Sequence, residues 1–243
     1  MSAGFGTMIL LRFSVATDHL YHALVKDPER QVPAGDVLVA PADGTVLYIR
    51  RVSDGVIPYV VKKGVEVPVR DHLKSGDESV FKNGYLIGIY MNTQGVHINR
   101  VPDNGTLESR TIFNGPHMDM TEAETRIILS QLVPGWVTVK KLLGLNPFGI
   151  EDHADYILKS ARETLRFRDS RGRDLYIVRI ADYYVGKILT WIRVGEAVER
   201  GQKLGMISWG SQTDMLFENS PGMSIAVEVG DYVYGGETVL ARY

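Results

Sequence analysis

The chain has 243 residues, of which 44% are hydrophobic and 23% are charged, and its formal net charge is −2. Such a chain is long and apolar enough to bury a core, and its composition is not that of a disordered protein. The low net charge, without a long basic run, argues against nucleic acid as a partner. The absence of cysteine excludes disulfides, thiolate nucleophiles and cysteine-ligated metals.

The N-terminal region predicts a short helix and no membrane span. The apolar run from Met8 to Leu11 is far shorter than the roughly 20 residues that cross a bilayer. It also lacks the basic leader and the cleavage site of a signal peptide. Residues 14–26 are compatible with a helix, which Asp27-Pro28 ends because a residue before proline avoids the helical region. We therefore expect a cytoplasmic protein, with peripheral membrane contact left open.

After Pro33 the sequence changes to short runs typical of strands, which are separated by glycines. Near the C-terminus, residues 194–204 and 229–239 share the pattern V-G-[DE]-x-V-x-x-G-x-x-[LV]. This pattern resembles the hairpin found twice in barrel-sandwich, or hybrid-motif, β domains such as biotinyl and lipoyl carriers, although the modifiable lysine tripeptide of carriers is absent. The expected fold class is α+β, mainly β, with a barrel-sandwich-like core. The predicted strands before the repeat are 37–40, 45–51, 59–61 and 85–91.

Residues 118–160 form a helical insertion in this β pattern. Thr121 followed by Glu124 is a capping-box pattern, which predicts a helix that ends at Pro134-Gly135. A second helical piece is expected near Glu151. Between them, apolar residues from 136 to 148 surround two lysines and suit either a packed lid or a surface that rests on lipid headgroups. We expect the packed arrangement.

Three separate turns carry the parts of a base-activated hydroxyl nucleophile: Asp43, His97 and Ser211. In such a group the histidine takes the hydroxyl proton, and the aspartate holds the imidazole in the right tautomer. Each residue also has a plain structural interpretation. Gly210-Ser211 is a common turn dipeptide, Asp43 is compatible with a turn aspartate, and His97 with a hydrogen-bonded histidine at a strand end.

Four motifs in matching order resemble those of the phosphatidylserine decarboxylase family. Residues 27–33 are similar to its F-R-D-P-x-R-x-x-P lead-in, although residues 24–26 depart from the aromatic start. Residues 41–44 match its P-A-D-G, and residues 97–102 resemble the H-V-N-R-x-P of its short members. Residues 209–214 resemble its F-G-S-R-x-D cleavage site. The resemblance extends from about residue 24 to residue 217.

The resemblance implies a single decarboxylase domain over residues 1–243. The chain would cleave itself between Gly210 and Ser211 into chains 1–210 and 211–243, which remain associated. His97, with Asp43 behind it, would activate Ser211, which then becomes a pyruvoyl cofactor. Through a Schiff base, this group would convert phosphatidylserine at a membrane surface to phosphatidylethanolamine and CO2. His97 is also the expected proton donor to the α-carbon of the substrate.

The chain departs from the family pattern at Arg100, where some members have a second histidine. Arg100 is a candidate ligand for a substrate carboxylate or phosphate. The insertion is longer than short members usually carry and could reshape the pocket, so a decarboxylase of a soluble amino acid stays open as an alternative. A separate alternative is an unprocessed, non-catalytic hybrid-motif binding protein. No metal site is expected, because His117, Asp119 and the acidic residues near His153 lack ligand spacing. His22 and His72 are interpreted as structural or exposed. The oligomeric state is left open, a homo-oligomer included.

Overall fold

The computed structural model describes most of the chain from Lys26 onward. The predicted helix before Asp27 and the predicted strand 59–61 lie outside the described residues. No helix within the described part is long and apolar enough to cross a membrane. The described residues are 26–58, 66–77, 80–92, 95–118, 120–133, 135–143, 145, 147–148, 155–181, 188–207 and 211–243.

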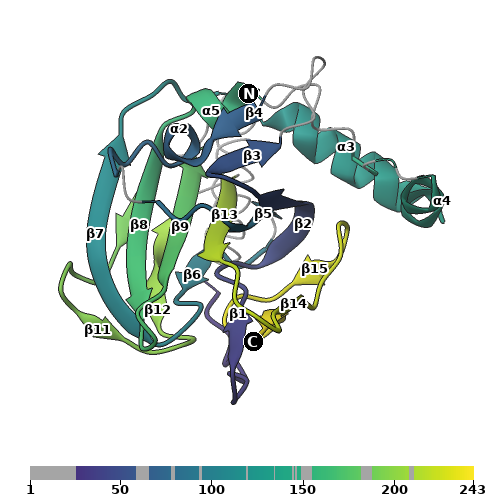
Figure 1. Cartoon of the computed structure of the whole chain (residues 1–243). Helices are drawn as coiled ribbons and strands as arrows, with labels where there is room; N and C mark the ends of the chain where they lie inside the picture. Colours follow the sequence, from purple (N-terminus) through teal and green to yellow (C-terminus); the bar gives the residue numbers. More distant parts are fainter. Residues whose placement is uncertain are drawn as a thin grey trace, which may run out of the picture.

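A curled, antiparallel sheet of eight strands forms the body of the molecule (Figure 1). Its central strand is β13, which pairs with β9 on one side and with β5 on the other. The predicted α+β, mainly β class is therefore confirmed. In order across the sheet the strands are β11 (Ala197–Val198), β7 (Gly105–Phe113), β8 (Arg162–Asp169), β9 (Asp174–Ala181), β13 (Ser211–Glu218), β5 (Gly84–Met91), β2 (Gly44–Val52) and β15 (Tyr232–Val233).

Smaller elements complete the fold. Two sheets have three strands each, β1-β16-β14 and β10-β12-β6, and β3 pairs with β4. The strands are β1 (Val37–Val39), β3 (Val56–Pro58), β4 (Glu66–Pro68), β6 (Ile98–Arg100), β10 (Ile188–Thr190), β12 (Lys203–Ile207), β14 (Ser224–Ile225) and β16 (Val239–Arg242). The described helices are α2 (Val69–Leu73), α3 (Thr121–Leu132), α4 (Trp136–Leu142) and α5 (Asp155–Lys159).

The large sheet separates two apolar cores, because successive side chains of a strand point to opposite faces. On β13, Met215 and Phe217 belong to a core shared with the two three-stranded sheets, which we call the inner core. Leu216 belongs to a second core, the outer core, which is shared with residues of α2, α3 and α5. The same alternation places Ser211 on the inner side of β13 and Asp214 on the outer side.

The predicted hairpin repeat is present in the backbone. Gly195 and Gly230 have φ of +86° and +95°, and each donates its N–H to a strand, at Leu107 and Val46 respectively. Glycine suits these turns because other residues are strained at positive φ. The two hairpins therefore bind two different strands in the same way.

The duplication extends to the strands that the hairpins bind. β1 and β6 begin at residues 37 and 98, and β2 and β7 begin at Gly44 and Gly105, so each pair is 61 residues apart. The pairing of β2 shifts register between residues 46 and 48, and the pairing of β7 shifts between residues 107 and 109. These strands and the two hairpins thus form two similar halves of a duplicated β unit, as expected of a barrel-sandwich-like core.

Two expectations for the insertion need correction. The first helix begins at Thr121 with Met120 as its N-cap, so Thr121 is not the capping residue. The packed arrangement of the following segment is wrong for Trp136, Leu142 and Leu143, which are exposed, because α3 and α4 project from the body (Figure 1).

Candidate functional site

Ser211 is the first residue of β13 and is fully buried. Its Oγ lies 3.4 Å from the Sδ of Met91, and the Oγ1 of Thr213 lies 3.3 Å from the same sulfur. A thioether is a weak acceptor, so it holds the hydroxyl proton of Ser211 only loosely. Gly210, on the other side of the predicted scissile bond, lies outside the described residues.

His97 immediately precedes β6 and is also fully buried. Its Nδ1 lies 2.9 Å from the carbonyl oxygen of Gly95. Because a carbonyl can only accept, Nδ1 carries the proton and Nε2 is the basic nitrogen. Nε2 is buried and has no hydrogen-bond partner among the described residues. Burial lowers the pKa of His97 below 6.5, which favours a neutral imidazole able to take a proton.

The histidine motif and the start of β13 converge around Met91, the last residue of β5. The Nδ2 of Asn99 lies 3.6 Å from the Sδ of Met91 and 3.3 Å from the Oγ1 of Thr213. The N–H of Ile207, shortly before Ser211 in the chain, donates to the carbonyl oxygen of His97 at 3.2 Å. His97 and Ser211 are thus brought to the same region, although no hydrogen bond joins them in the described part of the chain.

Asp43 is buried in the turn between β1 and β2. Its two carboxylate oxygens lie 2.9 and 2.8 Å from the Nη2 of Arg30, and its Oδ1 accepts the N–H of Gly235 at 2.7 Å. Burial raises the pKa of Asp43 even though Gly235 and Arg30 favour its ionised form. Among the described residues no hydrogen bond or ion pair joins Asp43 to His97, whose Nδ1 is held by Gly95 instead.

The internal duplication explains one of the bonds made by Asp43. In the second half of the fold, Asn104 occupies the equivalent position, 61 residues later. Its Oδ1 accepts the N–H of Arg200 at 2.9 Å, as the Oδ1 of Asp43 accepts that of Gly235. This contact is therefore a turn-forming bond that needs no charge. The ion pair between Asp43 and Arg30 has no equivalent at Asn104 among the described residues. A catalytic role of Asp43 stays a prediction.

Residues 27–30 form ion pairs with two of the other motifs, the one at residues 97–102 and the one at residues 41–44. The Oδ1 of Asp27 lies 2.6 Å from the Nη2 of Arg100, and Arg30 pairs with Asp43. The Nη1 of Arg100 also donates to the carbonyl oxygen of Gly201 at 3.0 Å. The structure thus gives the guanidinium of Arg100 protein partners, and binding of substrate by Arg100 stays a prediction.

A cavity of about 180 Å³ reaches β9, the strand next to Ser211, although Ser211 itself is not among its lining residues. Its lining includes Ala181, the partner of Ser211 in the β9–β13 pairing, together with Arg110 and Glu163. Arg110 Nε lies 2.5 Å from Glu163 Oε1, and Arg179 pairs with the other oxygen of Glu163. Burial opposes the ionisation of Glu163, yet Arg179 and its other donors hold its pKa below the usual value. The cavity is therefore lined by fixed charges of both signs.

A buried polar network on the outer face of β13 was missed by the sequence analysis. His72 Nε2 lies 3.0 Å from Asp214 Oδ2, and both side chains are fully buried. Tyr48 donates to the same oxygen at 2.8 Å, and Gln212 donates to Oδ1 at 2.6 Å. Burial lowers the pKa of His72 despite the carboxylate. The available signal was the pair of polar residues Gln212 and Asp214 at alternate positions of a strand, next to Leu216 on the same face.

A metal site is not indicated by the part of the chain that the structure describes. No group of three or more histidine, aspartate or glutamate side chains there could hold a metal ion. Of the cluster considered from the sequence, Asp119 and residues 151–153 lie outside the described residues, and His117 lines the same cavity as Arg110 and Glu163.

Comparisons with known proteins identify the family. The family model described as phosphatidylserine decarboxylase matches residues 18–241. A phosphatidylserine decarboxylase proenzyme of Nitrosomonas eutropha is 27% identical over 90% of this chain and 76% of its own length. A Methanocaldococcus jannaschii protein, provisionally named archaetidylserine decarboxylase proenzyme, is 29% identical over 89% of this chain and 86% of its own length. A phosphatidylserine decarboxylase proenzyme of Trichlorobacter lovleyi is 27% identical over 97% and 79%. The chain therefore belongs to the phosphatidylserine decarboxylase family of carboxy-lyases.

Proposed function

We propose that the chain is a proenzyme that cleaves itself between Gly210 and Ser211 and then converts phosphatidylserine to phosphatidylethanolamine and CO2. One observation carries the proposal. A buried serine hydroxyl with only a weak acceptor lies in the same region as a neutral histidine whose Nε2 has no partner among the described residues. This arrangement supplies a nucleophile and a base, as self-cleavage at a serine requires.

In the cleavage step, the Oγ of Ser211 attacks the carbonyl carbon of Gly210 while His97 Nε2 takes the hydroxyl proton. The peptide bond to the nitrogen of Ser211 breaks, so an ester replaces it and the amine is freed. Loss of the α-proton of residue 211 then expels the carboxylate of Gly210 and leaves dehydroalanine. Hydrolysis of the dehydroalanine consumes water, releases ammonia and leaves a pyruvoyl group at residue 211.

The surroundings of Ser211 fit such a group. Residue 211 is fully buried, its backbone pairs with Met91 and Ala181, and Ala181 lines the cavity that also contains Arg110 and Glu163. A pyruvoyl group supplies a conjugated carbonyl that accepts the electron pair released with CO2. Arg110, one of two arginines in the cavity lining, is a candidate to face the anionic part of a substrate, although it also pairs with Glu163. His97 would hold the proton that replaces the carboxylate.

The two products of cleavage would stay together, because the sheet does not depend on the broken bond. β13 pairs with both β5 and β9 along its length, and β15 and β16 pair with β2 and β1. Residues 211–243 are thus held by strands of residues 1–210. This supports one decarboxylase domain built from both chains.

The substrate test compares CO2 release from carboxyl-labelled phosphatidylserine in vesicles with release from free labelled amino acids. Release from the lipid alone is expected. Release from free amino acids alone would contradict the lipid as substrate and favour the soluble amino-acid decarboxylase. The matched variants are Ser211→Ala, which is expected to be inactive, and Thr213→Ala, which removes a hydroxyl that contacts the same Met91 sulfur and is expected to be active.

A further inference from the structure

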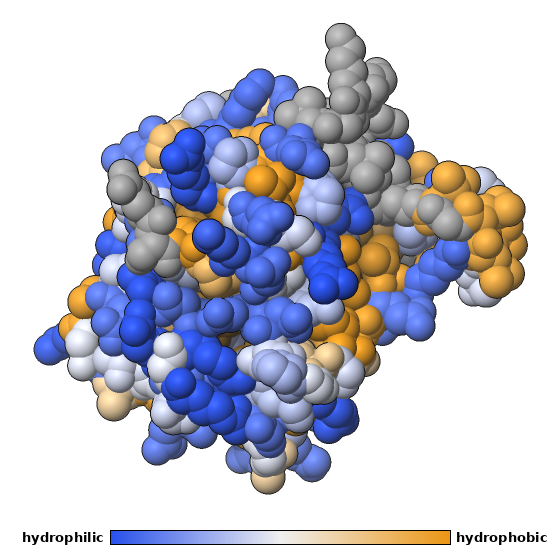
Figure 2. Space-filling model, in the orientation of Figure 1, coloured by the Kyte–Doolittle hydropathy of each residue, from blue (hydrophilic) through white to orange (hydrophobic). Residues whose placement is uncertain are grey.

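Helices α3 and α4 form a projection that carries most of the exposed large apolar side chains of the described residues. We call residues 120–145 the apolar arm. It extends to one side of the sheet body, and its outer part is a hydrophobic patch (Figure 2). The exposed apolar residues of the arm are Ile128, Leu129, Leu132, Val133, Trp136, Val139, Leu142, Leu143 and Leu145.

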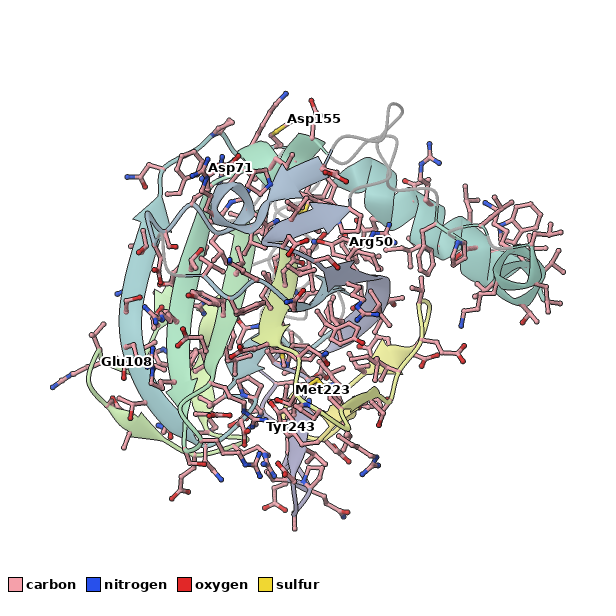
Figure 3. The ribbon with its side chains drawn as sticks, viewed as in Figure 1. Arg50, Asp71, Glu108, Asp155, Met223 and Tyr243 are labelled. Atoms are coloured by element: carbon pink, nitrogen blue, oxygen red, sulfur yellow. The ribbon has the colours of Figure 1, made fainter. Side chains whose placement is uncertain are left out.

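These residues are spaced as one face of each helix. Ile128, Leu129 and Leu132 follow the three- and four-residue spacing of a helix side, while Ile127 and Ser130 of α3 are buried. On α4 the exposed Trp136, Val139 and Leu142 continue the same spacing. At the outer end of the arm, around α4, side chains extend away from the body (Figure 3). An exposed apolar face of this extent marks a surface for a partner.

The charges of α4, the outer helix of the arm, favour an anionic partner. α4 carries Lys140 and Lys141 and no acidic residue, whereas the two glutamates of the arm belong to the first turn of α3. The ammonium of Lys140 lies 4.8 Å from the centre of the Trp136 ring. Between the helices is a cavity of about 360 Å³, lined by Arg126 and Lys140 together with mainly apolar side chains. Cations beside tryptophan and leucine are the composition of helices that lie in a membrane interface.

The arm is also connected to the candidate active site. Lys141 Nζ lies 2.9 Å from Glu228 Oε2, and a Cβ at Gly230 would lie 3.0 Å from Val137 Cγ1, so α4 contacts the loop before β15. Tyr232, two residues after Gly230, lies close to Gly95: its hydroxyl would be 3.3 Å from a Cβ added there. The carbonyl oxygen of Gly95 accepts the hydrogen bond of His97 Nδ1. β15 itself pairs with the start of β2, beside Asp43. One loop therefore joins the arm to two of the turns that carry the site.

We infer that the apolar arm docks the protein on an anionic phospholipid bilayer, with α3 and α4 lying in the interface and the site facing it. Leu132, Leu142 and Leu143 enter the acyl region, while Lys140 faces lipid phosphates. The inference rests on the proposed function, because a bilayer-resident substrate must reach His97 and Ser211 from the membrane.

Vesicle co-sedimentation tests the inference with full-length protein. The vesicles contain phosphatidylcholine and phosphatidylglycerol, so binding does not depend on turnover. The variant Leu142→Glu/Leu143→Glu is expected to weaken binding at least about tenfold, because two charges would have to enter the apolar layer. The matched control Leu189→Glu/Val194→Glu changes two exposed residues of the body and is expected to bind like the unchanged chain. Unchanged binding by the arm variant would overturn the inference.

Quenching by brominated phospholipid locates the contact. Trp136 and Trp191 are similarly exposed, on the arm and on the body respectively. Trp136→Phe is expected to remove most of the vesicle-dependent quenching, whereas Trp191→Phe is expected to leave it. The reverse result, or quenching that both variants retain in full, would place the contact elsewhere and overturn the inference.

Activity assays separate the failure of this inference from the failure of the proposed function. The arm variant is expected to decarboxylate dispersed short-chain phosphatidylserine at the rate of the unchanged chain and to lose activity on vesicles. If the unchanged chain turns over neither substrate, the proposed function fails, while vesicle binding still reports on the arm. If the arm variant is fully active on vesicles, the docking inference fails and the proposed function stands.

Discussion

Removing the cation that pairs with Asp43 tests the role of the lead-in segment. Both oxygens of Asp43 lie within 2.9 Å of Arg30 Nη2, and each side chain is 5% exposed. Arg30→Met would leave a buried carboxylate with the N–H of Gly235 as its remaining described donor. Removal of one partner of a buried ion pair costs about 3–5 kcal/mol. Since Gly235 still binds one oxygen, we expect a loss of about 3 kcal/mol.

The loss should depend on pH in a defined direction. Burial raises the pKa of Asp43 above 3.8 even with Arg30 present, and the loss of Arg30 would raise it further. As pH rises above 3.8, the unfolded carboxyl releases its proton before the folded one does. The pH-dependent part of the destabilisation by Arg30→Met therefore grows between the folded pKa of Asp43 in the unchanged chain and its higher folded pKa in the variant, and this part is absent below pH 3.8.

The assay is urea unfolding followed by circular dichroism, in a Ser211→Ala background that keeps every variant uncleaved. Asp43→Asn completes a double-mutant cycle, because Asn104 shows that an asparagine can form the same turn. The expected coupling energy is about 2 kcal/mol. Arg70→Met, at a side chain 71% exposed, is the control. If Arg30→Met is no more destabilising than Arg70→Met, or if the coupling is below about 0.5 kcal/mol, the ion pair does not stabilise the turn.

Three further predictions concern the buried histidines His97 and His72, the network residue Asp214 and the turn residue Asn104. His97→Gln should slow self-cleavage at least about 100-fold, followed on gels. Cleavage of the unchanged precursor should keep its rate as pH is lowered to 6.5, because burial lowers the pKa of His97. A rate that already falls above pH 6.5 would argue against His97 as the base. Burial lowers the folded pKa values of His72 and His97, so below pH 6.5 the unfolded chain binds protons before the folded chain does. The free energy of unfolding should therefore fall below pH 6.5 and level off below the folded pKa values. Equal stability at pH 8 and pH 5.5 would contradict this. Asp214→Ala should cost about 3 kcal/mol, since it leaves several buried partners unsatisfied, whereas Asn104→Ala should cost about 1 kcal/mol and leave cleavage intact; similar losses in urea unfolding would refute the distinction.

Local sequence patterns were sufficient to predict the repeated hairpins and several strands. Gly195 and Gly230 require positive φ within turns of a few residues, and the predicted strand 85–91 matches β5 closely. The duplication of β1 and β2 by β6 and β7 was missed, although residues 41–46 (P-A-D-G-T-V) and 102–107 (P-D-N-G-T-L) are similar. The shared register shifts are long-range properties that such a short pattern does not show.

The motifs also led to Ser211, His97 and Asp43 but not to their partners. The pairing of Asp43 with Arg30, and of His97 with Gly95, depends on how the chain brings distant turns together. A short sequence pattern records residue types and spacing, and it carries no information on which buried charge faces which. The exposure of Leu142 was missed for a related reason, because helical spacing shows which residues share a face but not whether another element covers it.

A denaturing mass spectrum of the purified chain tests the central claim most directly. Self-cleavage predicts two species, one ending at Gly210 and one beginning at residue 211 with a pyruvoyl group in place of the serine. The Ser211→Ala chain should remain one species near 27.1 kDa. A single species near 27.1 kDa from the unchanged chain, or cleavage after Gly210 in the Ser211→Ala chain, would contradict the claim.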